Sequence, residues 1–522
     1  MIILNNVKIP IDADSKSYRA IVADALKTSP ENISKLRLYR RSVDARRKND
    51  VHFCCSFTMN IVKDETAVLK HCKNASVFAE KEYIWKKSKI LPDNRPVVVG
   101  FGPAGMFAAL ALARAGLKPI VLERGYDVDR RTEDTERFFE SGAIDPDSNV
   151  QFGEGGAGTF SDGKLNTGIK DMRCRTVLKE FVRFGADKSI LIDAKPHIGT
   201  DILKGVVKNL RNEIISLGGE VRFGAHLDKI NTENGRLVSV TVNSKTLMCD
   251  RLILATGHSA RDTFEMLKDT GFEMCRKPFA MGVRIEHLQS EINRALYGDF
   301  ADSPQLSAAD YKLSAHLENG RGVFTFCMCP GGYVINASSE PGAVAVNGMS
   351  ESARDGDNAN SAVLVGVLPE DIDGDDVLGG CYLQAEIERR AFLLSGGGVP
   401  VSTLGSFLNG AEIPLGKIKP TVRPNPTVCD LNKIFPSYIT ESLKAGIKEF
   451  GKKIKGFDDP YAVLTAPETR SSSPVRVLRG DDMQSVSFAG VYPAGEGAGY
   501  AGGIVSAAVD GMRAAEAVIE SC

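Results

Sequence analysis

Three glycines and one acidic residue have the types and the spacing that bind a dinucleotide. Gly100, Gly102 and Gly105 follow an apolar run at residues 97–99. In such a pattern the glycines allow a tight turn, let a pyrophosphate approach the backbone and let the next helix pack closely. Glu123 stands about 20 residues further on, where an acidic side chain accepts hydrogen bonds from ribose hydroxyls. The stretch therefore predicts a strand, a turn and a helix N-terminus that hold the phosphates of a dinucleotide.

Two other stretches repeat the pattern of a buried strand that ends in small residues. Residues 490–492 predict a strand, followed by Gly495-Glu496-Gly497 and an Ala-rich helix that begins near Gly503. Residues 251–258 predict a buried strand that ends in Ala-Thr-Gly. With the first stretch, these resemble the two-dinucleotide-binding-domain flavoprotein superfamily, whose FAD contacts all three places. The resemblance implies that FAD is the cofactor.

A loop at residues 149–167 is unusually rich in glycine, which favours close approach of the backbone to a large ligand. In the superfamily this loop wraps the pyrophosphate and passes the flavin edge, so Ser161, Asp162 and Lys164 are candidates for contacts to the ring. The alternative is a glycine-rich turn with a surface lysine. The resemblance also places a backbone contact to the adenine near Leu227. The predicted cofactor-binding residues are Gly100, Gly102, Pro103, Ala104, Gly105, Glu123, Arg124, Gly156, Ala157, Gly158, Thr159, Ser161, Asp162, Lys164, Leu227, Ala255, Thr256, Gly257, Gly495, Glu496, Gly503 and Ile504.

Longer motifs narrow the resemblance to one family. The segments GEGGAGTFSDGKLNT, LATGHSARDTFEML, TFCMCPGGYV and PAGEGAGYAGGIVSAAVDG are similar to those of a bacterial family of FAD-dependent dehydrogenases. Members of that family carry the same small N-terminal domain, and the likeness extends over essentially the whole chain. It implies dehydrogenase or reductase chemistry and does not name a metabolite.

The candidates for catalysis are Lys164, His258, Arg284 and His287. Hydride transfer through a flavin needs the substrate carbon against N5, and often an acid that donates or accepts a proton. Lys164 is a candidate partner for N5 or the substrate, and either histidine is a candidate acid; each histidine has the alternative of being packed in the core. Arg284 alternates with Glu286 along a predicted strand, so the two side chains share a face. Arg284 then binds a substrate carboxylate or forms an ion pair.

The elements that must position these residues predict an α/β protein. With 522 residues, 43% of them hydrophobic and 25% charged, the chain is long enough for two or three globular domains. We expect a Rossmann-like FAD/NAD(P)-binding domain with an inserted β-rich α+β substrate domain and a small N-terminal ferredoxin-like α+β domain. The predicted bounds are 1–91 for the N-terminal domain, 95–270 and 460–522 for the two parts of the FAD-binding domain, and 271–455 for the substrate domain.

The N-terminal domain has a distinctive charge. Through Arg95 the chain holds 19 Lys and Arg against 11 Asp and Glu, a net charge of +8, and the remainder carries −9. We expect this domain to dock on the acidic remainder or to present a solvated basic face. A flavin-dependent RNA-modifying enzyme is the alternative, because basic clusters such as Arg46, Arg47 and Lys48 also bind nucleic acid. A flavin-binding sensor without turnover is a second alternative.

The cysteines of the chain are scattered and odd in number. The 11 cysteines include no C-x-x-C motif, so disulfide frameworks and zinc ribbons are not expected, and no metal-ligand spacing is present. Cys54-Cys55 and Cys327-Met328-Cys329 are the only close groups, and we expect both to be buried and inert.

We expect no membrane span, a cytoplasmic location, a small-molecule substrate and no nucleic-acid partner. NAD(P)H is expected to bind transiently, with an electron-carrier protein as the other source of electrons.

Overall fold

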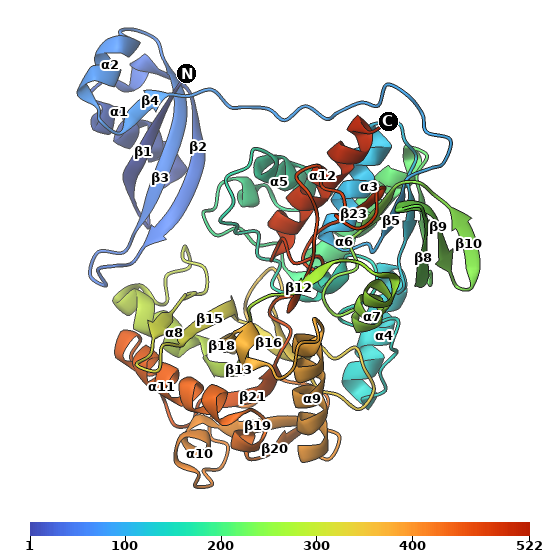
Figure 1. Ribbon diagram of the computed structural model, residues 1–522. Coiled ribbons are helices and arrows are strands. Elements are labelled where there is room, and N and C mark those ends of the chain that lie inside the picture. Colours follow the sequence, from blue (N-terminus) through green and yellow to red (C-terminus); the bar gives the residue numbers. More distant parts are fainter.

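A five-stranded parallel sheet lies at the centre of the cofactor-binding part of the molecule (Figure 1). The computed structural model describes residues 1–522. The strand order is β23-β11-β5-β6-β7, and neighbouring strands are parallel. The strands are β5 (Val97–Val99), β6 (Ile120–Leu122), β7 (Glu220–Arg222), β11 (Leu252–Leu254) and β23 (Val491–Pro493).

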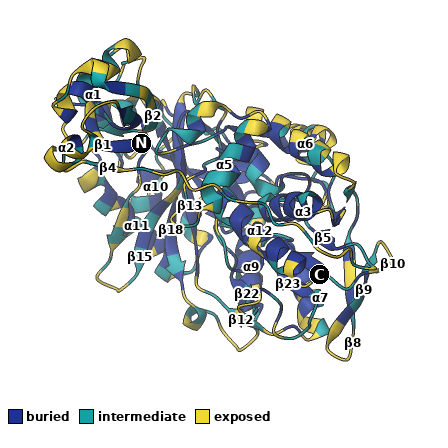
Figure 2. Ribbon diagram, turned by 90° about the horizontal axis from the view of Figure 1, so that it is seen from above, coloured by how far each residue is buried: buried dark blue, intermediate teal, exposed yellow.

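Both faces of this sheet are covered, which explains why its strands are apolar throughout. Val98 points into a core formed with helices, whereas Val97 and Val99 point into a second core on the other face. The helices on the first face include α3 (Pro103–Arg114), α5 (Arg173–Arg183), α6 (Thr200–Ser216) and α12 (Ile504–Glu520). The other face is covered by the antiparallel strands β8 (Leu227–Glu233), β9 (Arg236–Val242) and β10 (Lys245–Met248) and by α7 (Arg261–Thr270). Figure 2 shows α3 and α12 as largely buried.

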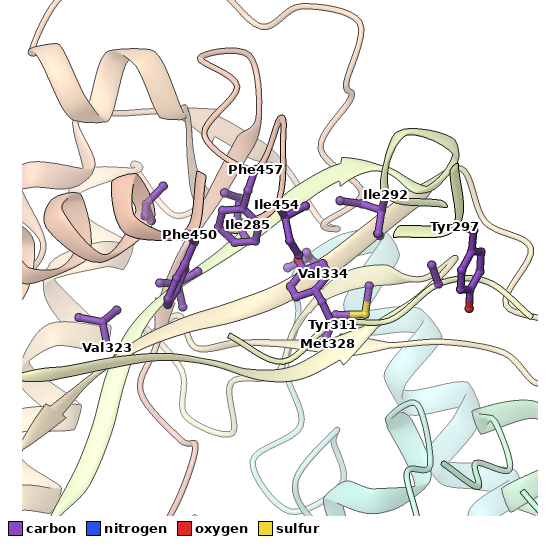
Figure 3. Packing of buried hydrophobic residues seen from close by; sticks show 14 of the residues in the cluster. Ile285, Ile292, Tyr297, Tyr311, Val323, Met328, Val334, Phe450, Ile454 and Phe457 are labelled. Atoms are coloured by element: carbon purple, nitrogen blue, oxygen red, sulfur yellow. The ribbon is translucent and has the colours of Figure 1, made fainter. Parts of the chain in front are cut away.

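The second domain is built on a seven-stranded mixed sheet of order β14-β15-β18-β13-β21-β19-β20. Its strands are β13 (Phe279–Leu288), β14 (Ser314–His316), β15 (Gly322–Cys329), β18 (Asn358–Val367), β19 (Val399–Thr403), β20 (Pro426–Val428) and β21 (Val463–Glu468). The helices α8 (Gln289–Tyr297), α9 (Gly379–Leu394), α10 (Leu404–Asn409) and α11 (Ser437–Lys453) and the hairpin β16 (Tyr333–Asn336) and β17 (Val346–Met349) complete the domain. Figure 3 shows its core, in which Phe450, Ile454 and Phe457 pack beside Ile285 of the central strand.

One predicted boundary is displaced by this sheet. The sequence places residues after 460 in the FAD-binding part, but β21 pairs with both β13 and β19. The six-residue run VLTAPE is short enough to fit either sheet, so only tertiary pairing assigns it. The chain crosses between the two domains at β12 (Met274–Arg276) and β22 (Val475–Val477), which pair antiparallel.

The N-terminal domain has the βαββαβ order that the sequence predicts. Its antiparallel sheet has the order β2-β3-β1-β4, as in a ferredoxin-like sandwich. The elements are β1 (Ile2–Pro10), α1 (Tyr18–Leu26), β2 (Ile33–Asp44), β3 (His52–Ile61), α2 (Glu65–His71) and β4 (Ala75–Val77). Tyr83 follows β4 in an irregular segment along the cofactor-binding domain, where its hydroxyl donates to Glu516 at 2.6 Å.

The basic N-terminal domain contacts the rest of the chain through β2. The backbone of Arg41 exchanges hydrogen bonds with Ile192 and Ala194, and its side chain pairs with Asp193. Arg46, in the bend after β2, instead pairs with Asp44 at the end of that strand. Arg41 and Arg46 therefore form ion pairs with carboxylates of the same chain. None of the helices combines the length and the apolar character that crossing a membrane requires.

Candidate functional site

The carboxyl ends of four parallel strands bring the sequence motifs to one edge of the five-stranded sheet. Gly100 follows β5, Glu123 follows β6, Ala255-Thr256-Gly257 follows β11, and Gly495 comes just after β23. Ligands of open parallel sheets bind at this edge, where the strand order changes direction. Residues that are almost 400 positions apart in sequence therefore line one site.

One end of this edge holds a small cavity. Glu123 is buried there, and its carboxylate accepts hydrogen bonds from the backbone N–H groups of Phe101 (2.7 Å), Gly125 (3.0 Å) and Gly153 (2.9 Å). A carboxylate has about four acceptor positions, so one direction remains for a ribose hydroxyl. The lining residues are Val99, Gly100, Leu122, Glu123, Arg124, Phe152, Ala225, His226, Leu227, Thr256, Ala260 and Thr263, which include five of the predicted cofactor residues.

The glycines beside this cavity form a cradle that fits a pyrophosphate. A Cβ on Gly100 would lie 2.3 Å from the carbonyl oxygen of Ala255, and one on Gly105 would lie 1.9 Å from that of Gly100. Gly102 differs, because the nearest atom to its Cβ position is 3.7 Å away, an ordinary van der Waals distance. No side chain caps the N-terminus of α3 or that of α12, which begins after Gly503. Two helix N-termini thus offer backbone N–H groups to anionic oxygens at this edge.

The predicted loop is held in shape by a residue that sequence reasoning missed. Arg131 on α4 (Val128–Ser141) is fully buried and donates to the carbonyl oxygens of five loop residues. Burial lowers the pKa of Arg131 to about 10, so the guanidinium stays charged at neutral pH. In the sequence nothing distinguishes it from Arg130, which is exposed. The acceptors are Asn149, Val150, Gly153, Glu154 and Gly156.

Asp162 and Lys164 lie at the end of this loop, against the second domain. Asp162 is fully buried and accepts from Lys164 at 2.5 Å and from both donors of Arg354 at 2.9 and 2.5 Å. Burial opposes its charge, but the two cations hold the pKa of Asp162 below its usual value. Lys164 remains 26% exposed, so its ammonium can reach a bound molecule.

His258 and Glu496 meet where β11 and β23 end. The carbonyl oxygen of Arg470 accepts from Nε2 of His258 at 2.9 Å, and Nδ1 lies 3.7 Å from Glu496. Burial lowers the pKa of His258 to about 4, so the ring is neutral near pH 7. Burial raises the pKa of Glu496 to about 7, although Lys277 opposes this shift. Of this pair, the carboxyl group changes charge near neutral pH, whereas the sequence favoured the histidine.

The structure separates Arg284 from His287. Arg284 is fully buried and donates to Glu468 (2.8 Å), Asn360 (2.9 Å) and the carbonyl oxygen of Cys327 (2.7 Å). Arg284 therefore forms an ion pair, but its partner is Glu468 and not Glu286, with which the sequence had paired it. His287 points to the other face of β13, where the carbonyl oxygen of Phe457 accepts from its Nε2 at 2.8 Å. His287 is not brought to the site.

A sheet edge with a buried carboxylate, a glycine turn and two uncapped helix N-termini is typical of a dinucleotide-binding protein. Three family models match the chain. "FAD-dependent protein, C-terminal domain-like" matches residues 278–471, "Pyridine nucleotide-disulphide oxidoreductase" matches residues 94–277, and a domain of unknown function matches residues 1–59. A Clostridium beijerinckii protein, described as "Uncharacterized protein", is 49% identical over 525 residues that cover 99% of this chain and 98% of that one. The chain belongs to this family of FAD-dependent oxidoreductases, within the two-dinucleotide-binding-domain flavoprotein superfamily, and FAD is its cofactor.

Three solved structures match large parts of this chain at low sequence identity and low TM-score. A geranylgeranyl bacteriochlorophyll reductase-like protein from Thermoplasma acidophilum is 14% identical with a TM-score of 0.36, over 81% of this chain and 77% of that one. Glycerol-3-phosphate dehydrogenase from Bacillus halodurans, complexed with FAD, is 10% identical with a TM-score of 0.35, over 82% and 65%. Glycine oxidase from Bacillus cereus is 10% identical with a TM-score of 0.30, over 82% and 95%.

Proposed function

We propose that this protein is a dehydrogenase or reductase whose organic substrate binds between the edge of the five-stranded sheet and the second domain. Bound FAD supplies hydride chemistry through N5. The observation that carries the proposal is the position of Glu496, directly after β23 in the C-terminal cofactor motif and in contact range of His258. A carboxyl group with a pKa near 7 is suited to give or take a proton at neutral pH.

Glu496 is the group that we assign to proton transfer. Its side chain is 28% exposed, so it is accessible to a bound substrate. Lys277 is the nearby cation that favours the carboxylate, whereas burial favours the neutral acid. These opposed effects leave both protonation states accessible near pH 7. His258 stays neutral and fixes the backbone of Arg470, so its role is positional.

Lys164 is the group that we assign to substrate orientation. Its ammonium has one ion-pair partner, Asp162, and three N–H donors, so it can also donate to an oxygen atom of the substrate. Arg284 lacks this freedom because it is fully buried and its donors are engaged. We therefore propose a substrate with a polar oxygen, such as a carbonyl or carboxylate, near Lys164.

An anaerobic spectrum followed by titration with NADH and NADPH tests the function. We expect the purified protein to contain FAD and one of the two nucleotides to bleach the oxidised band. If the FAD stays oxidised with both, the direct nicotinamide route fails, and candidate substrates and reduced carrier proteins are tested next as donors. FAD that no donor reduces would favour a non-catalytic flavin-binding protein. Absence of bound FAD would overturn the proposal.

A further inference from the structure

A short irregular segment, residues 192–199, pairs with two different domains at its two ends. We call it the connecting segment. It lies between the 3₁₀ helix Lys188–Leu191 and the start of α6, and only Lys195 within it is exposed. A segment without a helix or ladder of its own must bond its backbone groups to neighbouring elements. The partners of this backbone therefore show what the segment joins.

The first end of the connecting segment pairs with the N-terminal domain. The N–H of Arg41 donates to the carbonyl oxygen of Ile192 at 2.9 Å, and the N–H of Ala194 donates to the carbonyl oxygen of Arg41 at 2.8 Å. The side chain of Arg41 adds an ion pair with Asp193 at 2.9 Å. In an antiparallel ladder, a residue directs its N–H and its C=O to the same side. Arg41 therefore uses the outer edge of β2, and its bonds leave the pairing of β2 with β3 intact.

The second end of the connecting segment pairs with the cofactor loop on both sides of Lys164. The N–H of Leu165 donates to the carbonyl oxygen of Pro196 at 2.9 Å. The N–H of Ile198 donates to the carbonyl oxygen of Gly163 at 3.1 Å. These bonds form an antiparallel bridge with Lys164 at its centre. The backbone of Lys164 is therefore fixed by the connecting segment.

The spacer between these two pairings is stiff. Only Lys195 separates Ala194, which bonds to the N-terminal domain, from Pro196, which bonds to the cofactor loop. Proline fixes its own φ at about −65° and restricts the residue before it to extended conformations. A displacement of Ala194 is therefore passed on to the backbone beside Lys164.

We propose that the N-terminal domain positions Lys164 through the connecting segment, with Arg41 as the positioning residue. This inference rests on the proposed function, in which Lys164 orients an oxygen atom of the substrate, and it gives the N-terminal domain a part in substrate binding. The second domain holds the ammonium of Lys164 through Asp162 and Arg354. The N-terminal domain holds its backbone, so Lys164 is set from two sides.

Three variants of β2 separate the backbone pairing from other effects. R41P removes the N–H that binds Ile192, at an outward-facing position of an edge strand, where proline is tolerated. R41M removes the ion pair and keeps both backbone bonds, so it is the matched control for the side chain. V43P controls for the proline itself, because Val43 lies two residues further along the same strand and makes no bond to the connecting segment.

Hydrogen exchange of the full-length protein, measured by mass spectrometry on peptic peptides, follows the pairing beside Lys164. We expect the peptides that contain Leu165 and Ile198 to exchange about 2–10-fold faster in R41P than in wild type, which is the effect of losing one hydrogen bond. R41M and V43P should exchange at the wild-type rate in these peptides. Faster exchange in R41P that is confined to residues 192–195 would overturn the proposal, because the domain would then dock without acting on Lys164.

Acetylation with limiting acetic anhydride reports on the side chain of Lys164. Trypsin does not cleave after an acetylated lysine, so modification joins residues 138–164 to residues 165–170. Lys245 on the distant strand β10 is exposed and serves as the internal reference. We expect the ratio of Lys164 to Lys245 labelling to rise in R41P and to stay at the wild-type value in R41M and V43P. An unchanged ratio in R41P would assign the N-terminal domain a structural role only.

A further measurement needs no variant. Amides that open in one cooperative unit exchange with a common free energy as denaturant is added. We expect Arg41, Ala194, Leu165 and Ile198 to open together in wild type. Continued protection of Leu165 and Ile198 after Arg41 and Ala194 have exchanged would overturn the positioning role and leave the flavin function intact. Absence of bound FAD would overturn the flavin function, and the exchange pattern would still decide whether the N-terminal domain holds Lys164.

Discussion

At the scale of single residues, the site separates groups that the sequence treated alike. His258 and Glu496 lie within 3.7 Å of each other and both are desolvated, yet desolvation moves their pKa values in opposite directions. It disfavours the charged form in each case, which is the cation for histidine and the anion for glutamate. Of these two residues, Glu496 is therefore the one whose charge changes near neutral pH.

Replacement of Glu496 by Gln tests this assignment. Below pH 7 the carboxyl is protonated and neutral, and above pH 7 it is ionised, so the absorbance of bound FAD should show a transition near pH 7. We expect E496Q to lose this transition. Once a substrate is identified, we expect E496Q to turn it over about 10²–10⁴-fold more slowly than wild type. H258Q should keep the transition, since His258 titrates near pH 4. A transition that persists in E496Q would assign it to another group.

At the scale of elements, the cofactor loop depends on one side chain of α4. Arg131 fills the space beside Gly153. A Cβ added to Gly153 would lie 2.4 Å from the Cδ atom of Arg131. The loop carbonyl groups have no regular strand or helix to pair them, so this guanidinium replaces secondary structure as their donor.

Replacement of Arg131 by Met should unfold this loop. It leaves five buried carbonyl groups without their donor, and each unpaired group costs about 1–3 kcal/mol. We expect a loss of at least about 3 kcal/mol of stability in the apoprotein and loss of FAD on desalting. R130M, on the same helix and exposed, is the control and should change stability by less than about 0.5 kcal/mol. Retention of FAD by R131M would contradict this role.

The crossing of α3 and α12 is the second element that sets the site. A Cβ on Gly511 would lie 2.0 Å from the carbonyl oxygen of Ala104, so any side chain there pushes the two helices apart. We expect G511A to cost about 1–3 kcal/mol and to weaken FAD binding, because both helix N-termini move. G502A should be tolerated, since no atom lies within 4 Å of its Cβ position. Thermal unfolding measures the stability of G511A and G502A, and desalting measures how much FAD each retains. Equal stability and equal FAD retention in the two variants would contradict the close crossing.

At the scale of the whole molecule, Asp162 joins the cofactor loop to the second domain through Arg354. Loss of its charge leaves Arg354 and Lys164 without their shared anion, so we expect D162N to cost about 3–5 kcal/mol at neutral pH. The pKa of Asp162 is lowered in the folded state, so its contribution is present above the ordinary value of 3.8 and is lost as the pH falls through the folded value. The stability difference between wild type and D162N should therefore shrink on acidification below that ordinary value.

The ion pair between Lys195 and Asp310 is the matched control, because it also joins the cofactor-binding domain to the second domain. Its lysine is 62% exposed, so solvent screens the interaction and D310N should cost no more than about 1 kcal/mol. Chemical unfolding curves at several pH values measure both variants. A loss in D310N as large as that in D162N would show that burial does not distinguish the two pairs.

The sequence alone determined the cofactor-binding half of this protein. The glycine pattern, Glu123 and the small residues after residues 252–254 and 491–493 are local signals, because a tight turn and a helix N-terminus are built from consecutive residues. The order of elements in the N-terminal domain is equally local.

Only the tertiary structure decided which side chains share the site and in what charge state. Arg131, Lys277 and Glu468 carry no local signal, and β21 joined the second sheet because pairing, not composition, assigns a short apolar strand. His287 left the group because strand alternation turns its side chain to the other face of β13. Desolvation and distances between charges depend on residues far apart in the chain, so these properties are fixed when the domains pack.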